Sequence, residues 1–71
     1  MPLYRQLVTQ IVEAITSGRL APGTRLPPTR LLAQERGLAR QTVLAAYQEL
    51  IAEGWVEGHV GRGTFVLPQN S

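Results

Sequence analysis

The sequence predicts a small α+β domain, mainly α-helical, in which three helices precede a β-hairpin. In residues 29–48 a small residue, Ala33, stands four positions before Gly37, and apolar Leu38 and Val43 follow. Two helices that cross closely need a small side chain at their contact, and the tight turn between them favours a residue that tolerates positive φ. A glycine-rich turn between two runs of β-formers comes next. Helix-turn-helix plus hairpin is the winged helix-turn-helix arrangement.

The first helix is expected over residues 2–17. Pro2 suits the first turn of a helix and Gly18 ends it, while apolar residues between them recur at every fourth position. This amphipathic pattern predicts one buried face, which consists of Leu3, Leu7, Val8, Ile11, Val12 and Ile15.

Turn-forming residues 18–28 separate the first helix from the second. A proline–glycine pair favours a turn, residues 24–26 fit a short extended segment, and two consecutive prolines prevent a helix from running through. The second helix is therefore expected to begin near Pro28 or Thr29 and to end at Gly37.

The third helix is expected from about Arg40 to Glu53, with Gly54 as its stop. The wedge between the second and third helices should be filled by Leu32, Leu38 and Val43. The buried stripe of the third helix should consist of Val43, Tyr47, Leu50 and Ile51.

A β-hairpin is expected after the third helix, because aromatic and β-branched residues at 55–57 and 65–67 flank the turn-forming residues 59–63. Residues 1–67 then make one winged-helix domain. Residues 68–71 have the composition of the start of a linker or of an artificial chain end.

Charge is distributed unevenly along the chain. All seven basic residues are arginine and all five acidic residues are glutamate. Residues 19–40 hold five arginines and one glutamate, whereas residues 41–60 hold three glutamates and no arginine. Arginine is suited to bidentate contacts with phosphate and guanine. The asymmetry therefore indicates a nucleic-acid face backed by an acidic face, with charges scattered for solubility as the alternative.

Several classes of protein are excluded by composition. The absence of cysteine excludes disulfides and thiolate metal sites. The absence of lysine excludes a Schiff base, and the absence of aspartate excludes a Ser-His-Asp set, so we expect no enzymatic activity and no metal site. No apolar run approaches the roughly 18 residues of a membrane span. The expected location is the cytoplasm, in association with the nucleoid and without a membrane partner.

The third helix carries the main candidates for contact with double-stranded DNA. A helix in the major groove presents its first turns and one face to base edges. At about 100° per residue, the face opposite the buried stripe consists of Arg40, Gln41, Leu44, Ala45 and Gln48. Arginine can pair with guanine and glutamine with adenine, and Thr42 is placed to offer its hydroxyl to phosphate. Ordinary solvated positions of a surface helix are the alternative.

Three arginines precede the third helix. Arg30 lies in the first turn of the second helix, which crosses the DNA backbone in this geometry, so we prefer a phosphate contact to a surface salt bridge. Arg25 and Arg36 stay open between these two interpretations.

The hairpin tip is a candidate wing. Gly61 and Gly63 allow the backbone to turn tightly and to approach DNA, and Arg62 between them can enter the minor groove. A soluble turn is the alternative. The single histidine, His59, is expected to decorate a strand.

The segments PLYRQL, SGRLAPGTRLPPTRLLA, ARQTVLAAYQELIAEGW and GRGTFV together resemble the N-terminal domain of GntR-type bacterial transcription regulators. The first of these segments and the run TVLAAYQELIAEG resemble the MocR subgroup most. The resemblance implies a longer natural protein, in which a linker joins this domain to an aminotransferase-like domain that binds pyridoxal phosphate; this chain itself would hold no cofactor. It also implies DNA contacts by Arg30, Arg40, Gln41, Thr42, Gly61 and Arg62.

Two positions depart from the family pattern. Ala39 stands where the family commonly has serine or threonine, and the missing hydroxyl removes a helix cap worth about 1 kcal/mol and a phosphate contact. Pro28 likewise replaces a usual serine at the start of the second helix.

Two alternatives to the MocR interpretation remain. The domain could belong to another GntR branch with a small effector-sensing domain, or it could be a winged helix that binds protein. A protein-binding third helix should present an apolar or acidic face, and only Leu44 and Ala45 fit that description. Specific DNA binding should need two copies on repeated half-sites, so we expect a homodimer in the full-length protein.

Overall fold

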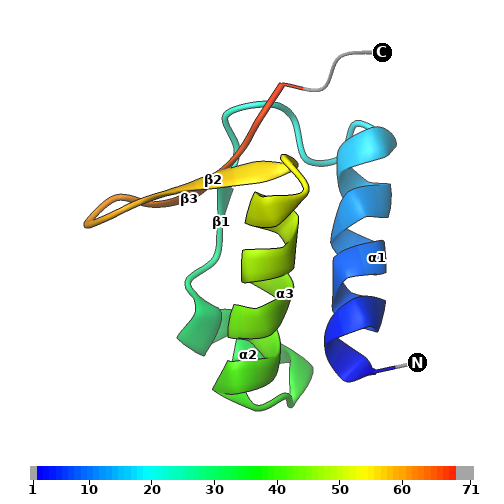
Figure 1. Cartoon of the computed structure of the whole chain (residues 1–71), viewed down its shortest axis with the longest axis vertical. Helices are drawn as coiled ribbons and strands as arrows, with labels where there is room; N and C mark the ends of the chain where they lie inside the picture. The colour runs from blue at the N-terminus through cyan, green and yellow to red at the C-terminus, as the bar shows by residue number, and fades with distance from the viewer. Residues whose placement is uncertain (1, 69–71) are drawn as a thin grey trace.

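The computed structural model describes residues 2–68 of the chain; residue 1 and residues 69–71, which hold most of the expected linker, lie outside that range. The described residues form α1 (Leu3–Thr16), β1 (Arg25–Leu26), α2 (Thr29–Arg36), α3 (Arg40–Ala52), β2 (Val56–His59) and β3 (Gly63–Val66). Three helices and antiparallel strands, with the β2–β3 hairpin after α3, confirm the predicted fold class. In Figure 1, α1 stands alongside α3, and the β2–β3 hairpin projects away from α1.

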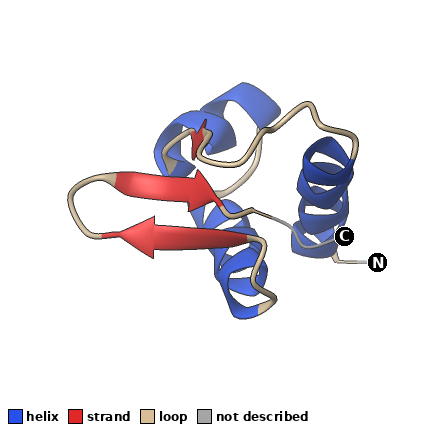
Figure 2. Ribbon diagram, turned by 90° about the horizontal axis from the view of Figure 1, so that it is seen from above, coloured by secondary structure: helices blue, strands red, loops and turns tan. Residues whose placement is uncertain are grey.

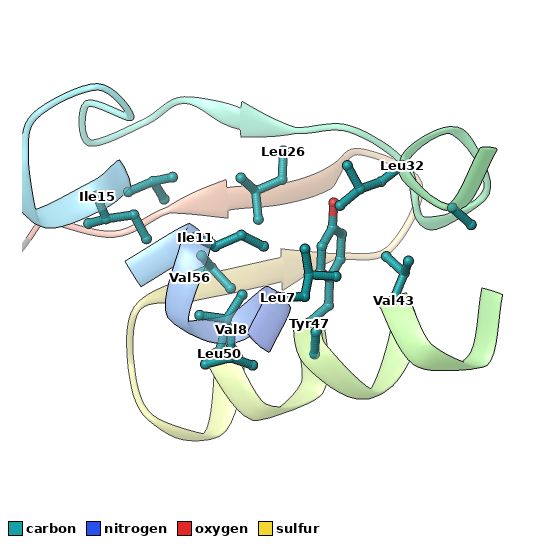
Figure 3. Packing of buried hydrophobic residues seen from close by; sticks show 13 residues of the cluster. Leu7, Val8, Ile11, Ile15, Leu26, Leu32, Val43, Tyr47, Leu50 and Val56 are labelled. Carbon is teal, nitrogen blue, oxygen red and sulfur yellow. The ribbon is translucent and has the colours of Figure 1, made fainter. Parts of the chain in front are cut away.

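One apolar core joins all the elements. Figure 3 shows side chains from α1, β1 and α3 converging on one space, among them Ile11, Leu26 and Leu50. The helix periodicity of the sequence produces this core, because residues three and four positions apart share a helix face. Its buried members are Leu7, Val8, Ile11, Ile15, Leu26, Leu32, Ala33, Val43, Ala46, Tyr47, Leu50, Val56 and Val66.

The turn between α2 and α3 has the geometry that its glycine predicts. Gly37 adopts the left-handed conformation, with φ 66°. The amide of Leu38 donates to the carbonyl oxygen of Ala33 at 2.9 Å, and the amide of Gly37 donates to that of Gln34 at 3.4 Å. These bonds satisfy carbonyls at the end of α2. Ala33 is 5% exposed, so the small side chain does lie at the helix contact.

The sheet has one more strand than a hairpin provides. Its order is β1-β3-β2 with antiparallel neighbours, and β1 pairs Arg25 with Phe65 and Leu26 with Thr64. The extended segment expected before α2 is therefore part of the sheet. Figure 2 shows β2 and β3 as a long ribbon, with the short β1 near the base of β3. We call β2, β3 and the tip at residues 60–62 the wing.

A buried hydroxyl ties α3 to the start of α2. The Tyr47 hydroxyl donates to the Pro27 carbonyl oxygen at 2.6 Å. Burial, and to a smaller degree the charge of Glu35, raises the pKa of Tyr47 to about 12. The hydroxyl therefore remains a hydrogen-bond donor at neutral pH and holds the β1–α2 junction against α3.

Two residues expected in the core are exposed instead. Leu3 is 57% exposed, because it occupies the first position of α1 and only the rim of the α2–α3 turn approaches it. Ile51 is 43% exposed, whereas Ala46, which the sequence did not single out, is fully buried. The stripe of α3 follows the 3–4 spacing through Val43, Ala46 and Leu50, and Ile51 lies at its edge.

Replacing Gly37 by alanine should lower the free energy of unfolding by about 1–2 kcal/mol, because a Cβ is strained in the left-handed conformation. No atom lies within 4 Å of the added Cβ, so backbone strain is the whole cost. Urea denaturation followed by circular dichroism measures it. Gly58→Ala is the matched control, since that Cβ would meet Ile51 at an ordinary 3.6 Å and the backbone is not left-handed. Equal losses in both variants would contradict the role of Gly37.

Candidate nucleic-acid interface

The face of α3 opposite the core is open to solvent. The core side is closed, with Val43 and Leu50 fully buried and Tyr47 4% exposed. The outward residues are Arg40, Gln41, Leu44, Ala45 and Gln48, all exposed except the half-buried Ala45. The structure therefore brings together the five positions that the sequence assigned to one face. Thr42 is half-buried and lies at the edge of that face, about 60° around the helix from Ala45 and on the side of Glu49.

The N-terminal end of α3 has no side-chain cap. Ala39 occupies the cap position in an extended conformation, and its methyl group offers no acceptor. The amides of Thr42 and Val43 donate to the Ala39 carbonyl oxygen at 3.0 and 3.3 Å. The amides of Arg40 and Gln41, which precede these two in the first turn, have no acceptor within the helix, and an anion can accept from them. The helix α2 begins in the same way, because Pro28 at its cap position makes no side-chain bond.

Glu49 of α3 and Glu53, which caps its C-terminal end, face α1. Arg5 Nη1 lies 3.5 Å from Glu49 Oε2 and 3.7 Å from Glu53 Oε2. A hydrogen bond shared with Glu53 raises the pKa of Glu49, whereas that bond and one from Trp55 Nε1 lower the pKa of Glu53. Such exposed ion pairs contribute little stability. The ion pairs direct the carboxylates of Glu49 and Glu53 toward α1, on a different side of α3 from Arg40 and Gln48.

The tip of the wing is fully open. Val60, Gly61 and Arg62 are exposed, and the Arg62 amide donates to the His59 carbonyl oxygen at 3.0 Å, which closes a turn with φ 78° at Gly61. His59 does decorate the strand, as expected. Its ring lies 2.5 Å from a carboxylate oxygen of Glu57 and packs edge-on against Phe65 at 5.8 Å.

Arg25 belongs to the base of the wing, a placement that the sequence left open. Its Nε lies 2.7 Å from the position that a Cβ on Gly63 would occupy, so the missing side chain of Gly63 makes room for this guanidinium. Arg25 borders both the hollow of the wing that includes Arg62 and a second hollow of about 240 Å³ beside Thr29. The position of Arg25 depends on the pairing of β1 with β3, which no local sequence pattern predicts.

The two arginines of α2 point in different directions: Arg30 is exposed, and Arg36 is directed toward α1. Arg30 is exposed in the first turn of α2, and none of the ion pairs within residues 2–68 involves it. The salt-bridge alternative for Arg30 therefore has no support. Arg36 Nη1 donates to Gln10 Oε1 of α1 at 2.8 Å, which turns Arg36 away from the wing.

Within residues 2–68 no three acidic, histidine or cysteine side chains cluster as metal ligands, and no helix there is long and apolar enough to cross a membrane. The arrangement of α2, α3 and the wing, with one polar face on α3, defines the class of winged helix-turn-helix DNA-binding domains. A family model for bacterial regulatory proteins of the gntR family matches residues 3–66. The chain belongs to the GntR family, and so is a non-enzymatic DNA-binding domain for transcription regulation.

Curated relatives share this segment but are longer. The chain is 44% identical over 66 residues to the probable rhizopine catabolism regulatory protein MocR of Rhizobium meliloti, a match that spans 93% of this chain and 13% of the relative. It is 46% identical over 65 residues to the HTH-type transcriptional regulator Rv1152 of Mycobacterium tuberculosis, across 92% of this chain and 54% of the relative. The chain thus spans about half or less of each.

Solved structures share the fold throughout. YtrA from Sulfolobus acidocaldarius, a GntR-family transcription factor, has a TM-score of 0.93 and 37% identity, with 99% of this chain and 73% of that chain covered. The DNA-binding domain of AraR in complex with operator ORR3 has a TM-score of 0.87 and 32% identity, with 93% and 80% covered. These similarities support DNA binding over the protein-binding alternative.

Ala39→Ser should raise the free energy of unfolding by about 1 kcal/mol, because the hydroxyl can accept from an amide of the first turn of α3. The melting temperature should rise by about 4–8 °C for a domain of this size. Thermal denaturation followed by circular dichroism measures the change. Ala52→Ser, at the opposite end of α3, should bring no gain, and a similar gain there would show that capping is not the cause.

Proposed function

We propose that this chain is the DNA-reading domain of a bacterial transcription regulator, with α3 in the major groove and the wing on the minor groove or backbone. The observation that carries this proposal is the outward face of α3. It presents one arginine and two glutamines, the residue types that hydrogen-bond purine edges, and the acids of α3 are held on another flank by Arg5.

Each outward polar side chain has a distinct role in this arrangement. Arg40 pairs with a guanine, and Gln41 and Gln48 hydrogen-bond adenines, because these are the bidentate pairings that the major groove allows. Thr42 gives its hydroxyl to a phosphate at the end of α3. Its half-buried position suits a contact with the backbone rather than with a base.

Further contacts to the DNA backbone come from α2 and the wing. Arg30 in the first turn of α2 is exposed and available to a phosphate. Gly61 and Arg62 form the exposed tip that enters the minor groove or follows the backbone. Arg25, at the base of the wing, adds a third positive charge near this path.

The whole protein extends beyond this domain. Residues 1–67 would form the DNA-binding domain and residues 68–71 would open a linker. The identity to MocR supports a MocR-type protein, in which an aminotransferase-like partner domain binds pyridoxal phosphate. The similar identity to the much shorter Rv1152 supports the other branch, with a small effector-sensing domain. Either protein would act as a homodimer on repeated half-sites, because one module of this size covers little DNA.

Arg40 and Arg30 should have separable effects on binding. Arg40→Ala should relax the base preference at one position and cost about 1–3 kcal/mol. Arg30→Ala should weaken binding to all sequences and reduce the slope of log affinity against log salt by about 1. Fluorescence-anisotropy titrations with duplexes chosen by in vitro selection, repeated at several salt concentrations, measure both. If neither variant changed binding, these roles would be wrong.

Arg62→Ala should reduce affinity by about 1.5–3 kcal/mol, the range of one hydrogen bond to a charged group. The melting temperature should be unchanged, because Arg62 is exposed at the tip. Arg19→Ala is the matched control, since it removes the same charge from the loop after α1, where the Arg19 side chain donates to Ser17 Oγ. Equal affinity of Arg62→Ala and Arg19→Ala proteins would make the wing a passive turn.

A further inference from the structure

Leu44 is an aliphatic side chain whose exposure the fold does not explain. It is 47% exposed, while its neighbour Val43 is fully buried. It is absent from the core of the described residues and from the half-buried side chains packed against that core. The other exposed aliphatic residue of α3, Ile51, has a structural reason, because its Cδ1 lies against β2, 3.6 Å from where a Cβ on Gly58 would stand.

The position of Leu44 is central to the outward face. Arg40 precedes it by one helical turn and Gln48 follows it by one turn, so both are its direct neighbours on the helix surface. Gln41 borders it on the other side at three residues. An apolar patch is thus enclosed by the side chains that the proposed function directs at base edges. A face designed only for water would gain nothing from leucine here, since exposed apolar surface is unfavourable.

The chemistry of the major groove offers one apolar partner. Each base edge presents hydrogen-bond donors and acceptors, and only thymine adds a methyl group, at C5. Leucine has no hydrogen-bonding atom, and the thymine methyl group is the base-edge group that its side chain can favour by apolar contact. We propose that Leu44 is a specificity-determining residue that reads a thymine C5-methyl beside the base contacted by Arg40 or Gln48. This inference rests on the proposed placement of α3 in the major groove.

The experiment removes the methyl group alone. A duplex is first selected from a random pool by the unmodified chain, and each of its thymines is then replaced singly by deoxyuridine, which keeps every hydrogen-bonding atom of the base. At one thymine of a half-site the affinity should fall about fourfold, the effect of burying one methyl-sized group. Leu44→Ala should bind the selected duplex more weakly and should lose this difference between thymine and uracil.

Ile51→Ala is the matched control, because Ile51 has similar exposure on the same helix but lies against β2. It should keep the full discrimination. The coupling energy between the Leu44→Ala substitution and the thymine-to-uracil replacement measures the contact between Leu44 and the methyl group. Effects of uracil on DNA shape are the same for both proteins and cancel.

The outcomes separate this inference from the function on which it rests. A selected duplex without a methyl-sensitive thymine, or a sensitivity that persists in Leu44→Ala, would overturn the role of Leu44 alone. Arg40→Ala would in that case still change base preference. If selection enriched no sequence and Arg40→Ala left DNA affinity and base preference unchanged, the proposed placement of α3 in the major groove would be wrong. The role of Leu44, which depends on that placement, would then be wrong as well.

Discussion

The left-handed turn at Gly37 is the constraint on which the rest of the structure depends. It ends α2 and sends the chain directly into α3, while Ala33 allows the two helices to pack closely. Once α3 is held in this way, Val43, Ala46 and Leu50 are fully buried against α1 and the sheet. Burial of one face necessarily exposes the other, so the core that stabilises the domain also sets which side chains of α3 are presented.

The sheet places the second part of the candidate interface. The β1 strand is only two residues long, yet its pairing with β3 links the turn before α2 to the base of the wing. Tyr47 strengthens the same region from α3 through its bond to the Pro27 carbonyl. Arg25 is paired with Phe65, two residues from Gly63 on the same face of the sheet, so its side chain can lie across Gly63, where glycine has no side chain. The geometry of the wing and the position of its basic residues thus have one cause.

The ends of the helices show a compromise between stability and binding. Both α2 and α3 begin without a side-chain cap, which gives up stabilisation that serine or threonine would supply. The first-turn amides left open are suited to phosphate. Arg5 meanwhile pairs with Glu49 and Glu53 on the α1 side, and none of the outward residues of α3 is acidic. Exposure of Leu44 on that face is consistent with selection for a partner surface rather than for folding.

The sequence alone was sufficient for the order of elements, the glycine turn, the outward face of α3 and the tip of the wing, because periodicity and turn chemistry are local properties. It misplaced Leu3 and Ile51, since a periodic pattern does not say where a neighbouring element ends. The third strand, the contact of Arg25 with Gly63 and the diversion of Arg36 to Gln10 required the folded structure. Each joins residues far apart in the chain, and their register depends on how the whole core packs.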